Sequence, residues 1–402
     1  MKVDPRVLTL LTILCLACNV NAQQSAPKPR ARDLAIPFRG TPGPLNAITD
    51  VPGVEVGFAT LISGDGKLVE GQGPVRTGVT VIFPRGKESL DSVMAGIFNL
   101  NGNGEMTGAN WVIEGGFLDG PIGITNTHSV GLVRDSIIKW QHDTHREPKN
   151  SMDGPYFLAL PVVAETADVP LNDINGFHVR PDDVFAALNS ATGGPVREGN
   201  IGGGTGMICF GWKGGTGTAS RKLAAAGDYM VGVLVQANNG RPDRLTIAGV
   251  PIGDELRPTS VRPSTVPPGT GSIIVIVATD APLLPSQLER LAKRAALGVG
   301  RVGGLGENSS GDLMLAFSTA NPNAATSGPV AKIDMLSNDS LDPLFGAAAD
   351  ATEEAIVNAM IAAETMTGAD NITVPALPHD KLIEILKKYE RQQIPGSSPA
   401  SK

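Results

Sequence analysis

The feature of this sequence that most restricts its fold is a short run of β-branched residues in the second half of the chain. Residues 272–278 read Ser-Ile-Ile-Val-Ile-Val-Ala. A run of this kind, without alternating polar residues, is typical of a strand buried on both faces. Such a strand needs a covering layer on each side of its sheet. The chain is therefore predicted to form a layered protein around this segment.

Helices and strands are predicted to mix along the whole chain, which favours an α/β class. Ser286 and Glu289 form the pattern of a capping box, and Gly368 has the position of a left-handed helix cap. Helices are expected over residues 180–189, 286–296, 352–366 and 380–391. Strands are expected within residues 46–61 and over 77–84, 228–237, 272–278 and 313–318. The Gly-rich stretch from 202 to 217 is expected to let the backbone pass close to its neighbours.

Charge and composition exclude several classes of function. The 402 residues carry a formal net charge of −7, and aromatic residues make up 4% of the chain. A nucleic-acid-binding protein normally shows a basic surface and aromatic stacking platforms, so that class of partner is not expected. Beyond the N-terminus, no segment has the eighteen or so apolar residues that a membrane-spanning helix needs.

The first residues have the pattern of an export signal. An apolar stretch from Val7 to Ala17 is too short to span a bilayer, and Val20-Asn21-Ala22 provides the small residues of a cleavage site. Residues 1–22 are thus predicted to be a signal peptide of a periplasmic or secreted protein. Lipidation at Cys18 and an apolar anchor that is never removed are the competing interpretations. Removal of the signal would leave Cys209 as the one cysteine, which predicts a buried thiol and no internal disulfide.

The junction before the apolar strand carries a chemical possibility. Residues 257–271 contain four prolines, read as an exposed linker, and end in Gly271-Ser272. A serine hydroxyl can attack the carbonyl carbon of a preceding glycine, and hydrolysis of the resulting ester cuts the chain. The new N-terminal serine would have an α-amine with a pKa of about 7.7–8, which can act as its general base. From the junction alone, a hairpin turn is the favoured interpretation.

A resemblance to a known family favours self-cleavage over the hairpin turn. The chain resembles the L-aminopeptidase/D-esterase family, which includes the β-peptidyl aminopeptidases and consists of self-cleaving hydrolases with an N-terminal nucleophile. One shared block reads Asn-Gly-Asn-Gly-Glu-Met-Thr-Gly. The blocks occur in order over nearly the whole mature chain, at 46–54, 101–108, 124–128, 161–166, 171–176, 198–207, 214–221, 235–238 and 271–278.

The resemblance implies an αββα four-layer sandwich that forms a single domain. It also implies self-cleavage between Gly271 and Ser272, which would give an α-chain of residues 23–271 and a β-chain of residues 272–402. The two chains are expected to stay together, because the strand that begins at Ser272 is too apolar to leave the core.

The same resemblance implies roles for individual residues. Ser272 would be the nucleophile, and Ser310 and Asp312 would orient its hydroxyl and amine. Asn238 would donate its amide to the developing oxyanion, and Glu165 would pair with the ammonium group of the substrate. In relatives an aromatic residue follows the Glu-Thr pair, whereas this sequence has Ala167 there.

Each of these residues also has a purely structural interpretation. Ser310 could cap a turn, and Asp312 could be solvated at the edge of a strand. Asn238 and Asn239 precede Gly240, and Asn-Gly is a strong hairpin signal. Glu165 lies in an apolar strand, where an unpaired carboxylate would be costly, so a paired or functional role is favoured for it.

Other reaction classes lack their motifs. The sequence contains no His-Glu-x-x-His zinc motif, no Gly-x-Ser-x-Gly nucleophile elbow and no Gly-Lys-Ser/Thr phosphate loop. No metal or organic cofactor is expected. The expected substrates are short peptides, amino-acid amides or esters with a free amino terminus, with D- or β-residues as further candidates, and the resemblance implies a homo-oligomer. Two alternatives remain: an amino-acid N-acyltransferase of related fold, and an uncut exported binding protein.

Overall fold

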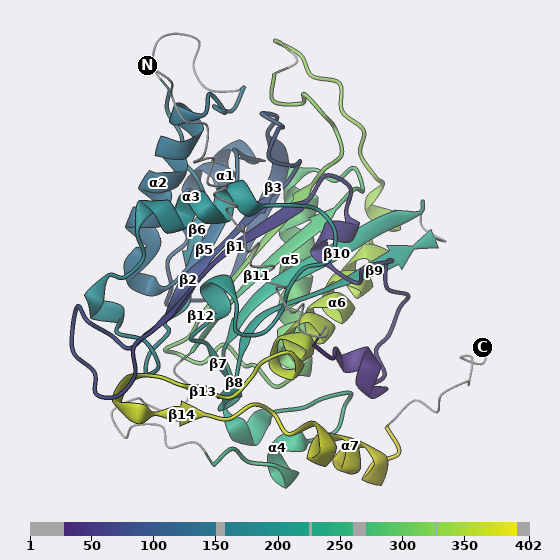
Figure 1. The fold of residues 1–402 in the computed structure, drawn as a ribbon. Coiled ribbons are helices and arrows are strands. Elements are labelled where there is room, and N and C mark those ends of the chain that lie inside the picture. Colours follow the sequence, from purple (N-terminus) through teal and green to yellow (C-terminus); the bar gives the residue numbers. More distant parts are fainter. Residues whose placement is uncertain (1–27, 150–156, 225–226, 260–270, 327, 392–402) are drawn as a thin grey trace, which may run out of the picture.

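The structure is a computed structural model that describes residues 28–149, 157–224, 227–259, 271–326 and 328–391. Two β-sheets lie face to face, and helices cover the outer face of each (Figure 1). The predicted signal peptide, residues 1–22, and most of the predicted linker before Gly271 are outside the described residues.

The larger sheet has six strands in the order β4-β3-β12-β11-β10-β9. Its two central strands, β11 and β12, are parallel, and the remaining neighbours are antiparallel. All eight residues of β11 are buried, as the β-branched run predicts. The strands are β3 (Val93–Gly102), β4 (Phe117–Leu118), β9 (Gly215–Leu223), β10 (Tyr229–Asn238), β11 (Ser272–Thr279) and β12 (Gly311–Ser318).

The smaller sheet has four strands in the order β1-β2-β5-β6, of which only the pair β5–β6 is parallel. The strands are β1 (Glu55–Ser63), β2 (Val75–Phe83), β5 (Ile122–Thr125) and β6 (Val163–Glu165). The remaining strands form two short hairpins: β7 (Ile208–Cys209) with β8 (Trp212–Lys213), and β13 (Met366–Thr367) with β14 (Thr373–Val374).

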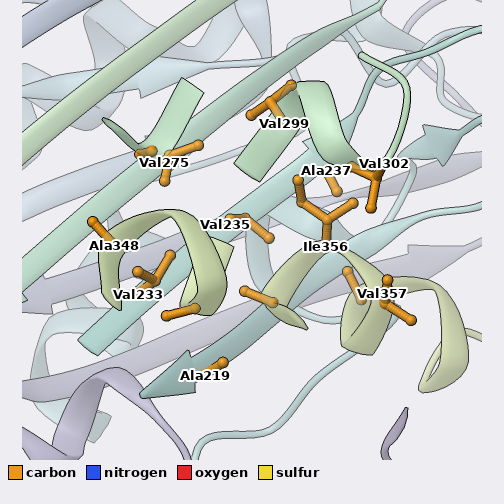
Figure 2. Packing of buried hydrophobic residues seen from close by; sticks show 14 of the residues in the cluster. Ala219, Val233, Val235, Ala237, Val275, Val299, Val302, Ala348, Ile356 and Val357 are labelled. Carbon is orange, nitrogen blue, oxygen red and sulfur yellow. The ribbon is translucent and has the colours of Figure 1, made fainter. Parts of the chain in front are cut away.

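Three apolar clusters fill the spaces between four layers. One lies between the six-stranded sheet and the helices α5 (Pro285–Arg301) and α6 (Asp342–Ile361), and it includes Val233 and Val275 of the sheet and Ile356 of α6 (Figure 2). The second lies between the two sheets, and the third lies under α2 (Val130–Asp143) and α3 (Pro181–Ser190). The predicted αββα four-layer sandwich is therefore confirmed. The other helices are α1 (Ala109–Gly115), α4 (Ile252–Glu255) and α7 (His379–Lys388).

Two predicted helix boundaries are wrong. The helix expected over 352–366 is α6, which begins ten residues earlier and ends at Ile361. Gly368 does not cap it; this glycine precedes a short 3-10 helix, and Met366 pairs with Val374 in a two-stranded hairpin. The Ala-rich start of α6 packs against the sheet, and this tertiary contact extends the helix beyond the predicted start.

Other local predictions were partly right. The predicted capping box of Ser286 and Glu289 does not form; two residues earlier, Gln287 Oε1 accepts the N–H of Leu284, and the leucine side chain makes no reciprocal bond. Within residues 46–61, the first part forms a 3-10 helix (Ile48–Asp50), and the strand begins at Glu55. Cys209 is a buried free thiol, as expected.

A buried ion cluster ties the start of the described chain to α6. Glu354 is fully buried and receives two hydrogen bonds of 2.8 Å from Arg32, one in which Asn46 donates at 2.6 Å, and an ion pair of 2.8 Å from Arg221. Burial by itself raises the pKa of Glu354, but the two arginines and Asn46 outweigh burial and lower it. The carboxylate is therefore ionised at neutral pH, and its contribution to stability is lost as the pH falls through its lowered pKa.

We predict that Glu354→Gln destabilises the fold by about 3–5 kcal/mol, because it leaves the buried Arg221 and the partly buried Arg32 without their counter-charge. The measurement is the midpoint of urea unfolding at pH 7. Asp143→Asn is the control, since Asp143 belongs to an exposed pair with Lys139 and its loss should cost less than about 1 kcal/mol. Equal midpoints for Glu354→Gln and the wild type would contradict the prediction.

Candidate active site

The candidate active site lies where strand ends from both sheets meet. Because β11 and β12 are parallel, their first residues lie at one edge of the sheet, and the antiparallel β10 and β3 end at that same edge. The register pairs Asn238 with Ser272, and Gly102 with Gly311. Residues far apart in the chain are thus brought together by strand pairing alone.

Ser272 is the first residue of β11, and its hydroxyl is held by the neighbouring strand. Its Oγ accepts the N–H of Gly311 at 3.0 Å. Ser272 is 8% exposed, so the hydroxyl lies in a mostly desolvated position at the sheet edge. An N–H donor at this distance lowers the energy of negative charge on the oxygen or on an atom bonded to it.

The glycine before Ser272 is required sterically. A Cβ at position 271 would lie 2.2 Å from the carbonyl oxygen of Asn238, closer than any real contact. The sequence suggested glycine here for the access it gives to its carbonyl carbon. The structure adds a second reason, which is the close approach of the backbone of β10.

Ser310 and Asp312 form a buried hydrogen-bonded pair beside the nucleophile candidate. The Ser310 hydroxyl donates to Asp312 Oδ1 at 2.6 Å, and both residues are 1% exposed. Burial raises the pKa of Asp312 to about 6, while hydrogen bonds from Ser310 and from the backbone of Ile273 act in the opposite direction. The carboxyl group is therefore next to the backbone that follows Ser272, and the interpretation of Asp312 as a solvated residue is wrong.

Two asparagines that the sequence did not single out hold the Ser310 loop. Asn101 Nδ2 donates to the carbonyl of Glu307 at 2.9 Å and also to that of Ser310, and Asn103 Nδ2 donates to the carbonyl of Ser309 at 2.9 Å. Their signal was the repeated Asn-Gly of the 101–108 block, whose role could not be read without the fold. This block positions the loop that carries Ser310 and Gly311.

Glu165 reaches the same place from the smaller sheet. It ends β6, is 4% exposed, and accepts hydrogen bonds from the Thr127 hydroxyl and from the N–H of Glu105 at 3.0 Å. Burial is the largest cause that raises its pKa. Gly104 lies between the two halves of the site: a Cβ there would be 3.3 Å from Glu165 Oε1 and 3.2 Å from the Gly311 Cα.

Asn238 lies beside Ser272, but its amide group is engaged elsewhere. Its Nδ2 donates to the carbonyl oxygen of Ala167 at 2.9 Å, and its Oδ1 accepts the N–H of Ile208 at 2.7 Å. The structure therefore brings Ser272, Ser310, Asp312 and Asn238 to one edge of the larger sheet and Glu165 to the facing edge of the smaller one. Their catalytic roles stay predictions.

Comparison with known proteins identifies the family. The model of peptidase family S58 matches residues 46–374. The chain belongs to peptidase family S58. The matched residues include both sheets and all the strand ends that build the site.

The relatives of this S58 peptidase agree with that assignment. The beta-peptidyl aminopeptidase BapA of Sphingosinicella microcystinivorans is 55% identical, with 91% of this chain and 94% of that protein covered. BapA of Sphingosinicella xenopeptidilytica is 50% identical, covering 94% of this chain and 96% of the relative. These similarities make the chain a hydrolase of the aminopeptidase type.

Solved structures place the fold among the N-terminal-nucleophile hydrolases. The L-aminopeptidase D-Ala-esterase/amidase of Ochrobactrum anthropi superposes with a TM-score of 0.84 at 48% identity, over 91% of this chain and all of the other. It is described as a prototype of the serine aminopeptidases and a variant of that hydrolase fold. A β-aminopeptidase of Burkholderia sp. has a TM-score of 0.80 at 46% identity, over 92% of this chain and all of the other.

Two searches of the described residues concern other classes of site. Within the ranges that the structure describes, no group of three or more His, Cys, Asp or Glu side chains could hold a metal ion. In the same ranges, no helix is long and apolar enough to cross a membrane.

We predict that hydrolysis by this S58 peptidase shows a step in its pH profile near 6, below any fall caused by protonation of the Ser272 amine, because Asp312 then becomes protonated and loses its negative charge beside Ser272. Asp312→Asn should remove this step from the pH profile of kcat/KM and lower the plateau. An unchanged profile in Asp312→Asn would show that another group titrates there.

The effect of Asp312 on stability has the opposite sign. Its folded pKa of about 6 lies above the ordinary value of 3.8. Its stabilising contribution is therefore complete below the unfolded value and is lost as the pH rises through about 6. At pH 7 Asp312→Asn should be at least as stable as the wild type in urea unfolding, which separates loss of activity from loss of the fold.

Proposed function

We propose that this chain is a self-processing serine aminopeptidase whose nucleophile is Ser272, freed by cleavage after Gly271, and that it releases N-terminal residues, including β-amino acids, from short peptides, amides or esters. The observation that carries the proposal is the environment of the Ser272 hydroxyl. It lies at a strand end, accepts the Gly311 N–H at 3.0 Å, and follows a glycine that no larger residue can replace.

The first step is cleavage of the chain itself. Ser272 Oγ attacks the carbonyl carbon of Gly271, the C–N bond to Ser272 breaks, and an ester links Gly271 to Oγ. Water then hydrolyses the ester, which leaves a carboxylate on Gly271 and a free amine on Ser272. The two parts stay associated because β11 lies between β10 and β12 at the centre of the larger sheet.

The catalytic cycle uses the new amine as general base. Ser272 Oγ transfers its proton to the amine and attacks the carbonyl carbon of the substrate. The tetrahedral intermediate collapses, the leaving amine takes the proton, and an acyl-enzyme ester remains. Water attacks this ester while the same amine takes its proton. The acyl group then leaves as a carboxylic acid product, and the amine returns the proton to Ser272 Oγ.

Two donors are placed to stabilise the oxyanion of the intermediate. The Gly311 N–H already contacts Ser272 Oγ, so it is within reach of an oxygen on the carbon that bonds to Oγ. The Asn238 amide lies on the opposite strand in register with Ser272, and its NH₂ group has a second N–H, besides the one given to the Ala167 carbonyl, that would donate to the intermediate. Asp312, together with Ser310, would stabilise the positive charge that develops on the Ser272 amine.

Glu165 is proposed to bind the ammonium group of the substrate. Its carboxylate is buried, hydrogen-bonded by Thr127 and Glu105, and separated from the Gly311 loop only by Gly104. A buried carboxylate this close to the Gly311 loop favours substrates whose amino group is unblocked, because it can pair with their ammonium group. The two curated relatives named above are beta-peptidyl aminopeptidases, which supports β-amino residues as substrates of this chain.

We further propose that the protein is exported. Residues 1–22 carry the pattern of a signal peptide, with lipidation at Cys18 as the second interpretation. Assembly into a homo-oligomer also stays a proposal, which size-exclusion chromatography with light scattering would test.

The proposal predicts two bands for the purified protein on a denaturing gel, with the smaller band beginning at Ser272-Ile273-Ile274 by N-terminal sequencing. Ser272→Ala should give one band and no hydrolysis. Ser318→Ala is the matched control, since this buried serine lies at the other end of β12 and should be cut and active. A stable single band for the wild type at neutral pH would contradict the mechanism and favour an uncut binding protein.

A second prediction concerns Glu165. Glu165→Gln should lower kcat/KM for substrates with a free amine by about 30-fold or more, because a buried partner of the ammonium group is lost. Glu105→Gln is the control, since the hydrogen bond to Glu165 comes from the backbone N–H of Glu105, and its exposed side chain acts on Glu165 only through charge repulsion, which the substitution relieves. Equal losses for the two variants, or no loss for either, would remove the ammonium role. An N-acylated amino-acid donor transferring to an amino-acid acceptor faster than to water would instead indicate the acyltransferase.

A further inference from the structure

Lys213 is an unusual residue in the small hairpin β7–β8. It is fully buried and ranks among the largest side chains with no exposed surface. Its Nζ donates to the carbonyl oxygens of Met207 at 2.7 Å and Gly214 at 2.9 Å. In the part of the chain that the structure describes, no salt bridge includes it, so Lys213 binds backbone oxygens rather than a carboxylate.

The chemistry of this site suits an uncharged amine. Burial lowers the pKa of Lys213 to about 7, because the ammonium form loses its hydration there. The neutral amine has two N–H donors, which matches the two carbonyls. Lysine is costly to bury, so a residue that only filled this space would be expected to be apolar.

The two carbonyls mark the ends of a closed loop. Between them, Ile208 pairs with Lys213 and Cys209 with Trp212, and the Gly214 N–H donates to the Met207 carbonyl at 2.9 Å. Lys213 therefore clamps the base of this hairpin from the inside. Without it, the carbonyl of Gly214 would lose the side-chain donor that holds it.

The hairpin is attached to the end of β10, where the oxyanion donor lies. The N–H of Ile208 donates to Asn238 Oδ1 at 2.7 Å, and the N–H of Phe210 donates to the Asn239 carbonyl at 2.8 Å. Position 214 approaches so closely that a Cβ there would lie 2.4 Å from the Ala237 carbonyl oxygen. A backbone N–H accepts no hydrogen bond, so Ile208 requires the oxygen of the Asn238 amide and directs its NH₂ group away from the hairpin.

We infer that Lys213 is a positioning residue for the hydrolysis: by clamping the 207–214 hairpin, it fixes the Ile208 N–H and thereby the orientation of the Asn238 amide beside Ser272. This inference rests on the oxyanion role of Asn238 in the proposed function. Lys213 touches no reacting atom. Its effect passes through the Met207–Ile208 backbone to the amide.

A double-mutant cycle tests this inference. The variants are Lys213→Met, which keeps the volume and removes the donors, Asn238→Ala, and the two together, each measured for kcat, KM and thermal unfolding. We expect Lys213→Met to lower kcat by about 10- to 100-fold, since small displacements of catalytic groups have effects of this size, with little change in KM. On the Asn238→Ala background the same substitution should change kcat by less than about twofold.

Thr352→Val is the matched control for loss of a buried hydrogen bond. Its hydroxyl donates to Ala348 within α6, remote from the strand ends of the site, so kcat should not change. If Lys213→Met does not fold, Lys213→Gln replaces it in the cycle, because glutamine stays polar but is one bond shorter, which loosens the contacts with the Met207 and Gly214 carbonyls; a smaller loss of the same kind is then expected. Where Asn238→Ala is cut too slowly to give mature enzyme, the rate of self-cleavage at Gly271–Ser272 replaces kcat in all variants.

The outcomes separate the two assignments. If Asn238→Ala keeps the kcat of the wild type, the oxyanion role fails, and the inference about Lys213 fails with it. The inference about Lys213 alone is overturned by either of two results. In one, Asn238→Ala is impaired but Lys213→Met is not; in the other, Lys213→Met lowers kcat by the same factor on the wild-type and Asn238→Ala backgrounds. A loss in Lys213→Met that disappears on the Asn238→Ala background supports it.

Discussion

The register of β10, β11 and β12 is the constraint on which the rest of the site depends. Ser272 faces Asn238 across an antiparallel pair and lies beside the start of a parallel neighbour that begins at Gly311. A slip by one residue would exchange the faces of every side chain in β11 and would separate the Ser272 hydroxyl from the Gly311 N–H. Two of the apolar clusters hold this register, because each buries one face of β11.

Close packing of backbone is the second condition. Gly271 lies against the Asn238 carbonyl, and Gly311 lies against Asn103 and Gly104 so tightly that a Cβ would be 2.5 Å from the Asn103 carbonyl oxygen. The absence of side chains at these points brings the ends of the two sheets within reach of each other. Glu165 and the Ser272 hydroxyl can then belong to one site although they lie in different sheets.

The buried charged groups described above fall into three kinds. Glu354 is neutralised by Arg32 and Arg221, and it connects the start of the described chain with α6. Asp312 and Glu165 have hydrogen-bond donors around them but no salt bridge in the described ranges, and burial raises the pKa of both. Lys213 is a third case, a buried amine held by carbonyls. Carboxylates of the second kind have no cationic partner in the described ranges, so they can pair with a positive charge that arrives with the substrate or develops during the reaction.

The sequence by itself determined the class of fold, the central strand and the chemical type of the site. The β-branched run of 272–278 can be stable only between two apolar layers, and the order of the blocks identified the family from which the αββα architecture followed. Local patterns were weaker where packing competes with them: α6 begins at Asp342 because its alanines pack on the sheet, and Gly368 does not cap it. Only the tertiary structure decided that Asn101 and Asn103 hold the Ser310 loop, that Gly271 lies against Asn238, and that Lys213 is connected to Asn238 through Ile208. These contacts join residues whose separation in the chain carries no periodic signal, and the packing of strand ends, loops and the β7–β8 hairpin brings them within hydrogen-bond distance.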